Sequence, residues 1–229
     1  MTISTLWEAF ELLLSGDKET YLIILRTLLV SGSAVLLGSL AGIPWGYRLS
    51  FRRGFWPRLV QTLMGIPPVV LGLFVYLLTS RQGPLGFLGW LFTPWAMILA
   101  QWLLVTPIVA ALSRVAIMES RQRHELLLRA LGANDRQLRR EVMREAVPSL
   151  SLAVAAGLGR AMAEVGAVML VGGNIRNSTR VLTTAIVLET RQGNFARATA
   201  LGLVLLLLSG LLNYSLEVLR ERWLTRGSV

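Results

Sequence analysis

The 229-residue chain contains no cysteine and only one histidine, His124. The lack of cysteine excludes disulfides, thiolate metal sites and a cysteine nucleophile, and one histidine cannot build a histidine-rich metal site. The chain also lacks the pattern GxxxxGK[ST], whose backbone amides hold the phosphates of ATP in many ATPases. We therefore expect no catalytic residues, no metal site and no cofactor in this chain.

Charged residues are scarce as well, at 16% of the chain, against about 25% in a typical soluble domain. Hydrophobic residues make up 54%, and the charges leave several long windows almost untouched. A window of about 20 apolar residues forms a helix that crosses the hydrocarbon core of a bilayer, which is about 30 Å thick. The composition therefore predicts an all-α integral membrane protein with one membrane domain, because no linker-like segment divides the chain.

Five windows are long enough to span a membrane, and they lie at 21–47, 59–78, 94–112, 147–171 and 198–219. The first 20 residues are predicted to form a separate N-terminal interfacial segment, followed by the membrane domain at 21–229. Within that segment, residues 6–14 are too few to span, but their apolar side chains share one helical face. That face consists of Leu6, Trp7, Phe10, Leu13 and Leu14.

The basic residues predict the orientation of the spans. The loops at 48–58 and 113–146 and the segment after 219 hold fifteen of the 23 Lys and Arg residues. The N-terminal segment and the two remaining loops hold six. The positive-inside rule places the arginine-rich loops in the cytoplasm, with the N-terminus outside and the C-terminus inside. The net charge of +10 is then a topological signal, and we expect no nucleic-acid partner.

A basic helical hairpin is predicted over about 119–148, between the third and fourth spans. Gly132 suits the left-handed residue that ends a helix, and Asn134 or Asp135 offers a side-chain cap for the next helix. Each helix has apolar residues that share a face, namely Leu127, Leu128 and Leu131 on the first and Leu138, Val142 and Ala146 on the second. Two short helices would form a compact knob suited to docking a partner. A solvated structural loop and a DNA-binding helix-turn-helix are the alternatives, although the second would press DNA against the membrane.

Two ionisable residues, Arg160 and Glu164, fall inside the fourth span, where each costs several kcal/mol by insertion scales. They are four residues apart, so they can pair along one face of a helix. Two interpretations remain open. The pair either locks neighbouring helices together or forms a polar patch on a transport path or its gate.

The segment that follows the fourth span combines glycine, asparagine, arginine and hydroxyl side chains. Thr183 and Thr184 begin an apolar run that is too short to cross, and we interpret it as a re-entrant or gate helix. Backbone amides beside Asn174, together with the hydroxyls and Arg180, suit an oxyanion. An ordinary outer loop is the alternative.

The hairpin resembles the EAA loop of ABC importer permeases, the coupling loop through which a permease engages its ATPase. The residues that carry the resemblance are Glu125, Leu128, Ala130, Gly132, Ala133, Asp135, Val142 and Pro148. Glu125 stands one position earlier than in the family pattern, and leucines occupy 126–128, where small residues are usual. The resemblance implies that these residues form the ATPase-coupling site and that the second hairpin helix ends near Pro148.

Residues 163–175 and 179–190 are similar to permeases that move molybdate, sulfate and tungstate, and most similar to those for tungstate. The resemblance implies a type I importer fold and uptake of tungstate, with molybdate or sulfate as alternatives. It also implies a homodimer in the inner membrane, cytoplasmic ABC ATPase subunits that bind ATP and Mg²⁺, and an extracytoplasmic oxyanion-binding protein. The expected path or gate residues are Arg160, Glu164, Asn174, Arg180, Thr183 and Thr184. Alternatives of another class are a membrane scaffold and an intramembrane enzyme, although Glu164 lacks a histidine, cysteine or carboxylate partner at workable spacing.

Overall fold

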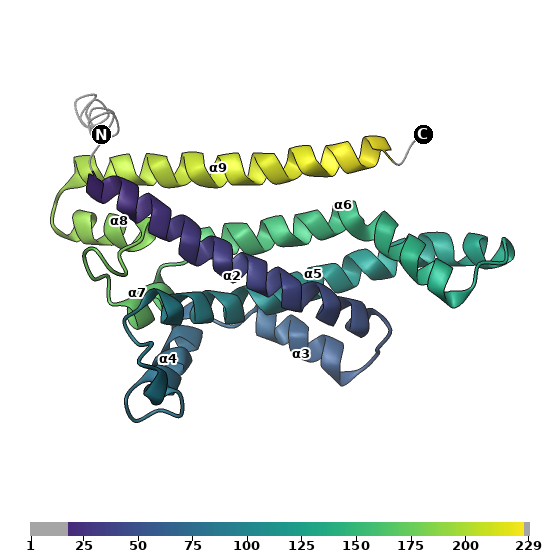
Figure 1. The fold of residues 1–229 in the computed structure, drawn as a ribbon, viewed down its shortest axis with the longest axis horizontal. Helices are drawn as coiled ribbons and strands as arrows, with labels where there is room; N and C mark the ends of the chain where they lie inside the picture. The colour runs from purple at the N-terminus through teal and green to yellow at the C-terminus, as the bar shows by residue number, and fades with distance from the viewer. Residues whose placement is uncertain (1–17, 227–229) are drawn as a thin grey trace.

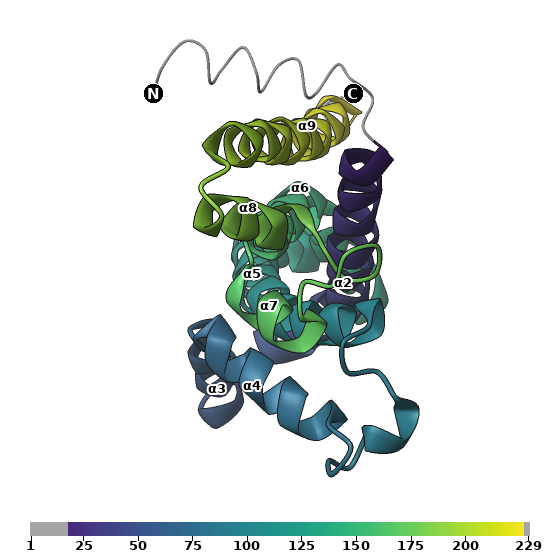
Figure 2. The ribbon, with the colours of Figure 1, turned by 90° about the vertical axis from the view of Figure 1, so that its left-hand side faces the viewer.

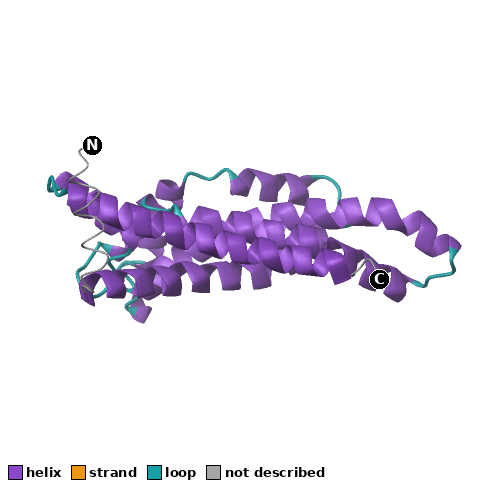
Figure 3. Cartoon of the chain, turned by 90° about the horizontal axis from the view of Figure 1, so that it is seen from above, coloured by secondary structure: helices purple, strands orange, loops and turns teal. Residues whose placement is uncertain are grey.

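A computed structural model describes residues 18–226, and over that range the chain is helical and contains no strand (Figure 3). The interfacial helix predicted at 6–14 lies outside the described residues. The elements in chain order are α2 (Lys18–Ser50), α3 (Phe55–Met64), α4 (Pro68–Thr79), the 3-10 helix η1 (Gly86–Leu88), α5 (Pro94–Ala130), α6 (Asp135–Met162), α7 (Gly166–Gly172), α8 (Leu182–Arg191) and α9 (Phe195–Arg226).

Three of these helices, α2, α5 and α9, are long and apolar enough to cross a membrane. They contain the windows predicted as the first, third and fifth spans. The pairs α3–α4 and α6–α7 pass the same test only when each bent pair is taken as one span, which raises the number to five within residues 18–226. The second and fourth windows therefore differ from the single helices expected.

The second window is bent by 98° between α3 and α4. Its break lies at two consecutive prolines, Pro67 and Pro68, and Pro67 has an extended backbone with ψ of 127°. A proline ring disfavours the helical conformation at the residue before it and removes a backbone donor. The two prolines thus turn one apolar window into an elbow.

The fourth window is bent by 58° between α6 and α7. The carboxylate of Glu164 lies in the break, and its Oε1 accepts a hydrogen bond from the amide of Ala167 at 2.9 Å. The first amides of a helix have no partner within the helix, so a side-chain acceptor stabilises the new start. A residue expected to face a transport path therefore also holds the bend in the main chain.

The centre of the fold is the long contact between α2 and α5. A Cβ atom placed on Gly42 would lie 2.9 Å from the carbonyl oxygen of Thr106, and one on Gly46 would lie 2.5 Å from that of Ala110. Only glycine permits this approach, so the two backbones touch directly. Figure 2 shows α9 on one side of this central group and the α3–α4 elbow on the opposite side.

The two ends of the molecule carry different segments (Figure 1). The start of α2 and helix α8 lie at one end, whereas the α5–α6 hairpin and the C-terminal end of α9 lie toward the other. The end of α2 also lies toward the hairpin, because Tyr47 and Phe51 line a cavity with hairpin residues. The three arginine-rich segments are thus oriented in the same direction, as the predicted topology requires.

Candidate functional site

The hairpin is an extension of the membrane helices rather than a separate knob. At 1.5 Å per residue, the 37 residues of α5 extend about 55 Å and the 28 residues of α6 about 42 Å, both longer than a bilayer core. Helix α5 continues to Ala130 because no proline or glycine interrupts it after Pro107. The expected end of the second helix near Pro148 is wrong, since α6 runs through that proline to Met162. The tip of the hairpin and the membrane segments therefore belong to the same two continuous helices.

The elbow of the hairpin is closed by two capping motifs. Gly132 is left-handed, with φ of +80°, and confirms the predicted helix end. The amide of Ala133 donates to the carbonyl of Leu128 at 2.9 Å, the bond that defines a Schellman motif. Asn134 caps α6 through a capping box with Gln137, and both hydrogen bonds measure 2.9 Å. Asp135, the other candidate cap, is instead the first residue of α6.

The apolar face predicted on the second hairpin helix is buried. Leu138, Val142 and Ala146 are at most 6% exposed and pack with Ala116 and Ile117 of α5. A hydrogen bond from the Ser120 hydroxyl to the Val142 carbonyl, at 2.9 Å, joins the two helices. This cluster holds the hairpin closed without help from a partner.

The first hairpin helix behaves differently, because only Leu128 of its predicted face packs against that cluster. Leu127 and Leu131 are 61% and 74% exposed, and Leu126 is 83% exposed. Contiguous exposed apolar side chains mark interaction surfaces on folded proteins. Of the three leucines predicted to share a face, only Leu128 packs inward, so the tip of the hairpin carries an apolar surface.

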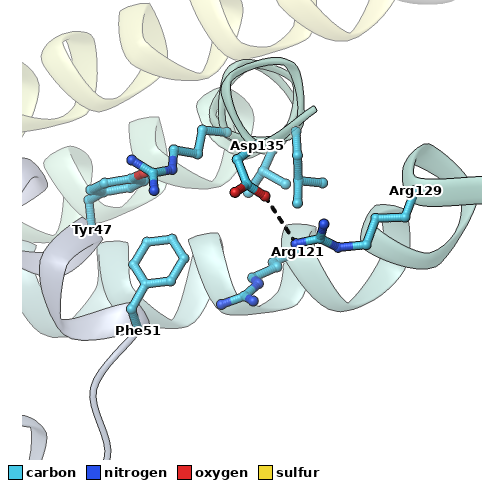
Figure 4. A pocket seen from close by; sticks show the side chains of 8 residues that line it. Tyr47, Phe51, Arg121, Arg129 and Asp135 are labelled. Atoms are coloured by element: carbon cyan, nitrogen blue, oxygen red, sulfur yellow. Dashed lines mark hydrogen bonds and ion pairs between the residues drawn. The ribbon is translucent and has the colours of Figure 1, made fainter. Parts of the chain in front are cut away.

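Glu125 is held on the surface of α5 by two arginines, one turn before it and one turn after it. Its Oε2 lies 2.7 Å from Nε of Arg121, and its Oε1 lies 3.2 Å from Nε of Arg129. The hydrogen bond from Arg121 holds the pKa of Glu125 below its ordinary value, with a smaller contribution from Arg129 and against the opposing effect of desolvation. Arg129 also pairs with Asp135 at 3.2 Å (Figure 4). Both acidic residues predicted to contact the ATPase, Glu125 and Asp135, thus form ion pairs within this chain.

The structure joins three of the six predicted path residues. Nη1 of Arg160 lies 3.5 Å from Oε2 of Glu164, which confirms that the two side chains pair. The hydroxyl of Thr183, on α8, donates to the main-chain carbonyl of Glu164 at 2.9 Å. Glu164 is 3% exposed, whereas the side chain of Arg160 is 36% exposed. The pair therefore carries one buried and one accessible charge at the α6–α7 bend.

The other three predicted path residues make different contacts. Arg180 pairs with Glu19 at the start of α2, at 3.0 Å. Thr184 is fully buried, and its Oγ accepts from the amide of Val181 at 3.1 Å, which caps α8. Asn174 is left-handed, with φ of +51°, and its buried Oδ1 has no hydrogen-bond partner among residues 18–226.

Comparisons with known proteins agree with this geometry. The profile of the family described as "Binding-protein-dependent transport system inner membrane component" matches residues 34–225. The chain belongs to this family of permease components. It is 39% identical to the tungstate uptake system permease protein TupB of Peptoclostridium acidaminophilum, over 93% of this chain and 95% of that protein. It is 40% identical to TupB of Campylobacter jejuni subsp. jejuni, over 93% and 91%.

A solved structure supports the fold of the permease. An inward-facing structure of the MetNI methionine ABC transporter matches with a TM-score of 0.67 and 19% identity, covering 97% of this chain and 99% of that one. Family and fold make this chain a multi-pass inner-membrane permease rather than an ATPase. The fold is thus shown independently of the sequence motifs.

Sequence reasoning missed two polar features of the permease. Gln101, 3% exposed in α5, donates to the carbonyl of Ala161 at 3.1 Å, while its Oε1 has no partner within the described range. The position of Gln101 in the middle of an apolar window could have identified it, because a polar side chain inside a membrane raises the free energy of insertion unless it has a partner. Glu19 also binds Arg176 at 2.6 Å and Arg197 at 3.4 Å. No spacing rule predicts that cluster, since Glu19 lies more than 150 residues before each of its arginine partners.

Proposed function

We propose that this permease is the membrane pathway of an ATP-driven importer of tungstate or a related tetrahedral oxyanion. Its identity of 39% and 40% to two tungstate uptake permeases, each over 93% of the chain, supports the substrate class. Molybdate and sulfate share the shape and the charge of tungstate and remain the alternative substrates. The absence of GxxxxGK[ST] means that ATP and Mg²⁺ are bound by a partner.

The exposed tip of the hairpin is the observation that carries the coupling role. Leu126, Leu127 and Leu131 expose most of their surface, and burying one leucine side chain stabilises by about 1.5–3 kcal/mol. The capping motifs at Gly132 and Asn134 present these leucines on an ordered turn, so little ordering entropy is lost on docking. We assign residues 119–148 of the permease as the coupling hairpin that binds an ABC ATPase. The residues assigned to coupling are Glu125, Leu128, Ala130, Gly132, Ala133, Asp135, Val142 and Pro148.

The proposed topology has five spans, with each bent pair crossing once, the N-terminus outside and the C-terminus in the cytoplasm. The common orientation of the arginine-rich segments supports this arrangement. The membrane domain is assigned to residues 21–229, after an N-terminal segment at 1–20. Two copies form the transport unit, with two cytoplasmic ATPases and an extracytoplasmic oxyanion-binding protein.

The transport path runs past the α6–α7 bend in this proposal. Arg160 offers an accessible cation beside the buried Glu164 carboxylate. A passing dianion competes with that carboxylate for the guanidinium, so the ion pair acts as a gate element. Thr183 and Thr184 hold α8 at this point, while Asn174 and Arg180 lie in the segment between α7 and α8.

Reconstitution in proteoliposomes tests the proposal. The permease, its ATPase and its binding protein are assembled, and ATP-dependent uptake of labelled tungstate is measured with molybdate or sulfate as competitors. We expect uptake that requires both ATP and the binding protein, with tungstate outcompeting the other two anions. ATPase activity without anion uptake would refute the import function, and stronger competition by sulfate would reassign the substrate.

A further inference from the structure

Three adjoining cavities surround Phe51 where α2 ends beside the hairpin. Their volumes are about 210, 370 and 400 Å³, and Phe51 lines all three. Tyr47 and Arg139 are shared by two of them, as are Arg52 and Arg121. Figure 4 shows Tyr47 and Phe51 facing the arginines of the hairpin across the smallest cavity. The three cavities therefore adjoin one another around Phe51, and we call them together the Phe51 basin.

The Phe51 basin has a large surplus of positive charge. Its lining contains seven arginines and two carboxylates, Glu125 and Asp135. Both carboxylates are already paired with Arg121 or Arg129. Arg48, Arg52, Arg53 and Arg139 have no carboxylate within 4 Å among residues 18–226. These four cations are left to an external anion.

Aromatic side chains place the Phe51 basin at the boundary between membrane and water. Phe51, Phe55 and Trp56 are 47%, 67% and 49% exposed, and they follow directly on the apolar length of α2. Tryptophan and tyrosine side chains gather at the headgroup level of a bilayer, and Trp56 carries this signal here. The ring of Phe51 also lies 4.9 Å from the guanidinium carbon of Arg121, so it orients that cation. Any anion in the basin is thus held beside lipid.

We propose that the Phe51 basin binds the phosphate group of an anionic phospholipid, such as phosphatidylglycerol. Arginine side chains match the oxygens of a phosphate, and basic pockets beside membrane helices recognise anionic headgroups. The exposed rings of Phe51 and Phe55 pack against the glycerol backbone and the upper acyl chain, which a free oxyanion lacks. The proposal stands on the basin alone and does not depend on tungstate import.

Native mass spectrometry of the full-length subunit in detergent tests this site. The protein is titrated with phosphatidylglycerol or with zwitterionic phosphatidylcholine, and bound lipid is counted. We expect a preference of about tenfold or more for phosphatidylglycerol. The variant Arg52→Gln/Arg139→Gln removes two cations that each line two of the cavities. It should weaken phosphatidylglycerol binding by about fivefold for each arginine, or about 25-fold in total.

A matched control separates the site from overall charge. Arg136→Gln/Arg140→Gln also removes two positive charges, both from α6 on either side of Arg139, at exposed residues that line none of the three cavities. This variant should bind phosphatidylglycerol like the unaltered protein. Equal loss in both variants would overturn the site. Size-exclusion profiles and circular dichroism establish that all three proteins are folded.

Competition distinguishes the lipid from a soluble anion of the same chemistry. Inorganic phosphate and tungstate, each at millimolar concentration, are added to the lipid-bound protein. We expect phosphatidylglycerol to remain bound, because the aromatic contacts hold the lipid and not the free ions. Displacement by either free anion, or equal binding of phosphatidylcholine, would refute a phospholipid site.

Discussion

Replacing Gly132 with alanine tests whether the hairpin elbow transmits motion. A Cβ atom at Gly132 meets no other atom within 4 Å, so the substitution introduces no clash. Its cost comes from the backbone alone, since φ is +80° and a left-handed conformation costs an L-residue about 1–2 kcal/mol. A cost of that size changes an equilibrium constant by a factor of about 5–30. We expect ATP-driven uptake to fall by up to this factor.

The assay is uptake in proteoliposomes that contain the ATPase and the binding protein, with the inserted permease quantified. Gly193→Ala is the matched control, because Gly193 has φ of +81° and also meets nothing within 4 Å, but lies in the turn between α8 and α9. Uptake should persist in Gly193→Ala. Gly132→Asn should recover part of the loss, since asparagine tolerates the left-handed region. Full uptake in Gly132→Ala, or an equal loss in Gly193→Ala, would refute the coupling role.

Three further tests by substitution address the apolar tip, the ion pair and the cap. Leu126→Ser/Leu127→Ser should reduce copurification of the ATPase while leaving the unfolding temperature unchanged, because both side chains are exposed. Arg160→Gln leaves the buried Glu164 without its ion pair, so the free energy of unfolding should fall by about 1–3 kcal/mol after allowance for the exposure of Arg160. Adding Glu164→Gln removes the unpaired charge and should restore part of the lost stability, as measured by thermal unfolding. Asn134→Ala should cost about 1 kcal/mol and speed hydrogen exchange at the amide of Gln137.

Much of the turn between the two hairpin helices was predictable, because the residues that form it act on neighbours close in sequence. Gly132 and Asn134 act through their own backbone and through partners three to five residues away, so the sequence predicts where the helix ends and the next begins. The Arg160–Glu164 pair was predictable for the same reason, as four-residue spacing places both on one helical face. The exposure of Leu127 and Leu131 was not predictable from the sequence. Periodicity identifies which residues share a helical face, but it does not say whether another helix covers that face.

The amino-acid order alone determines the class of this protein, since apolar windows of bilayer length and arginine-rich loops follow from solvation energies that act residue by residue. Two of the windows bend at local features, the Pro67–Pro68 pair and the Glu164 carboxylate, but only the tertiary structure decided how far each window bends, because the angle depends on the helices that pack on either side. It also decided which charges meet. Glu19 pairs with Arg176 and Arg180, and the Phe51 basin collects arginines from three helices and a loop, through contacts that depend on packing and not on sequence distance.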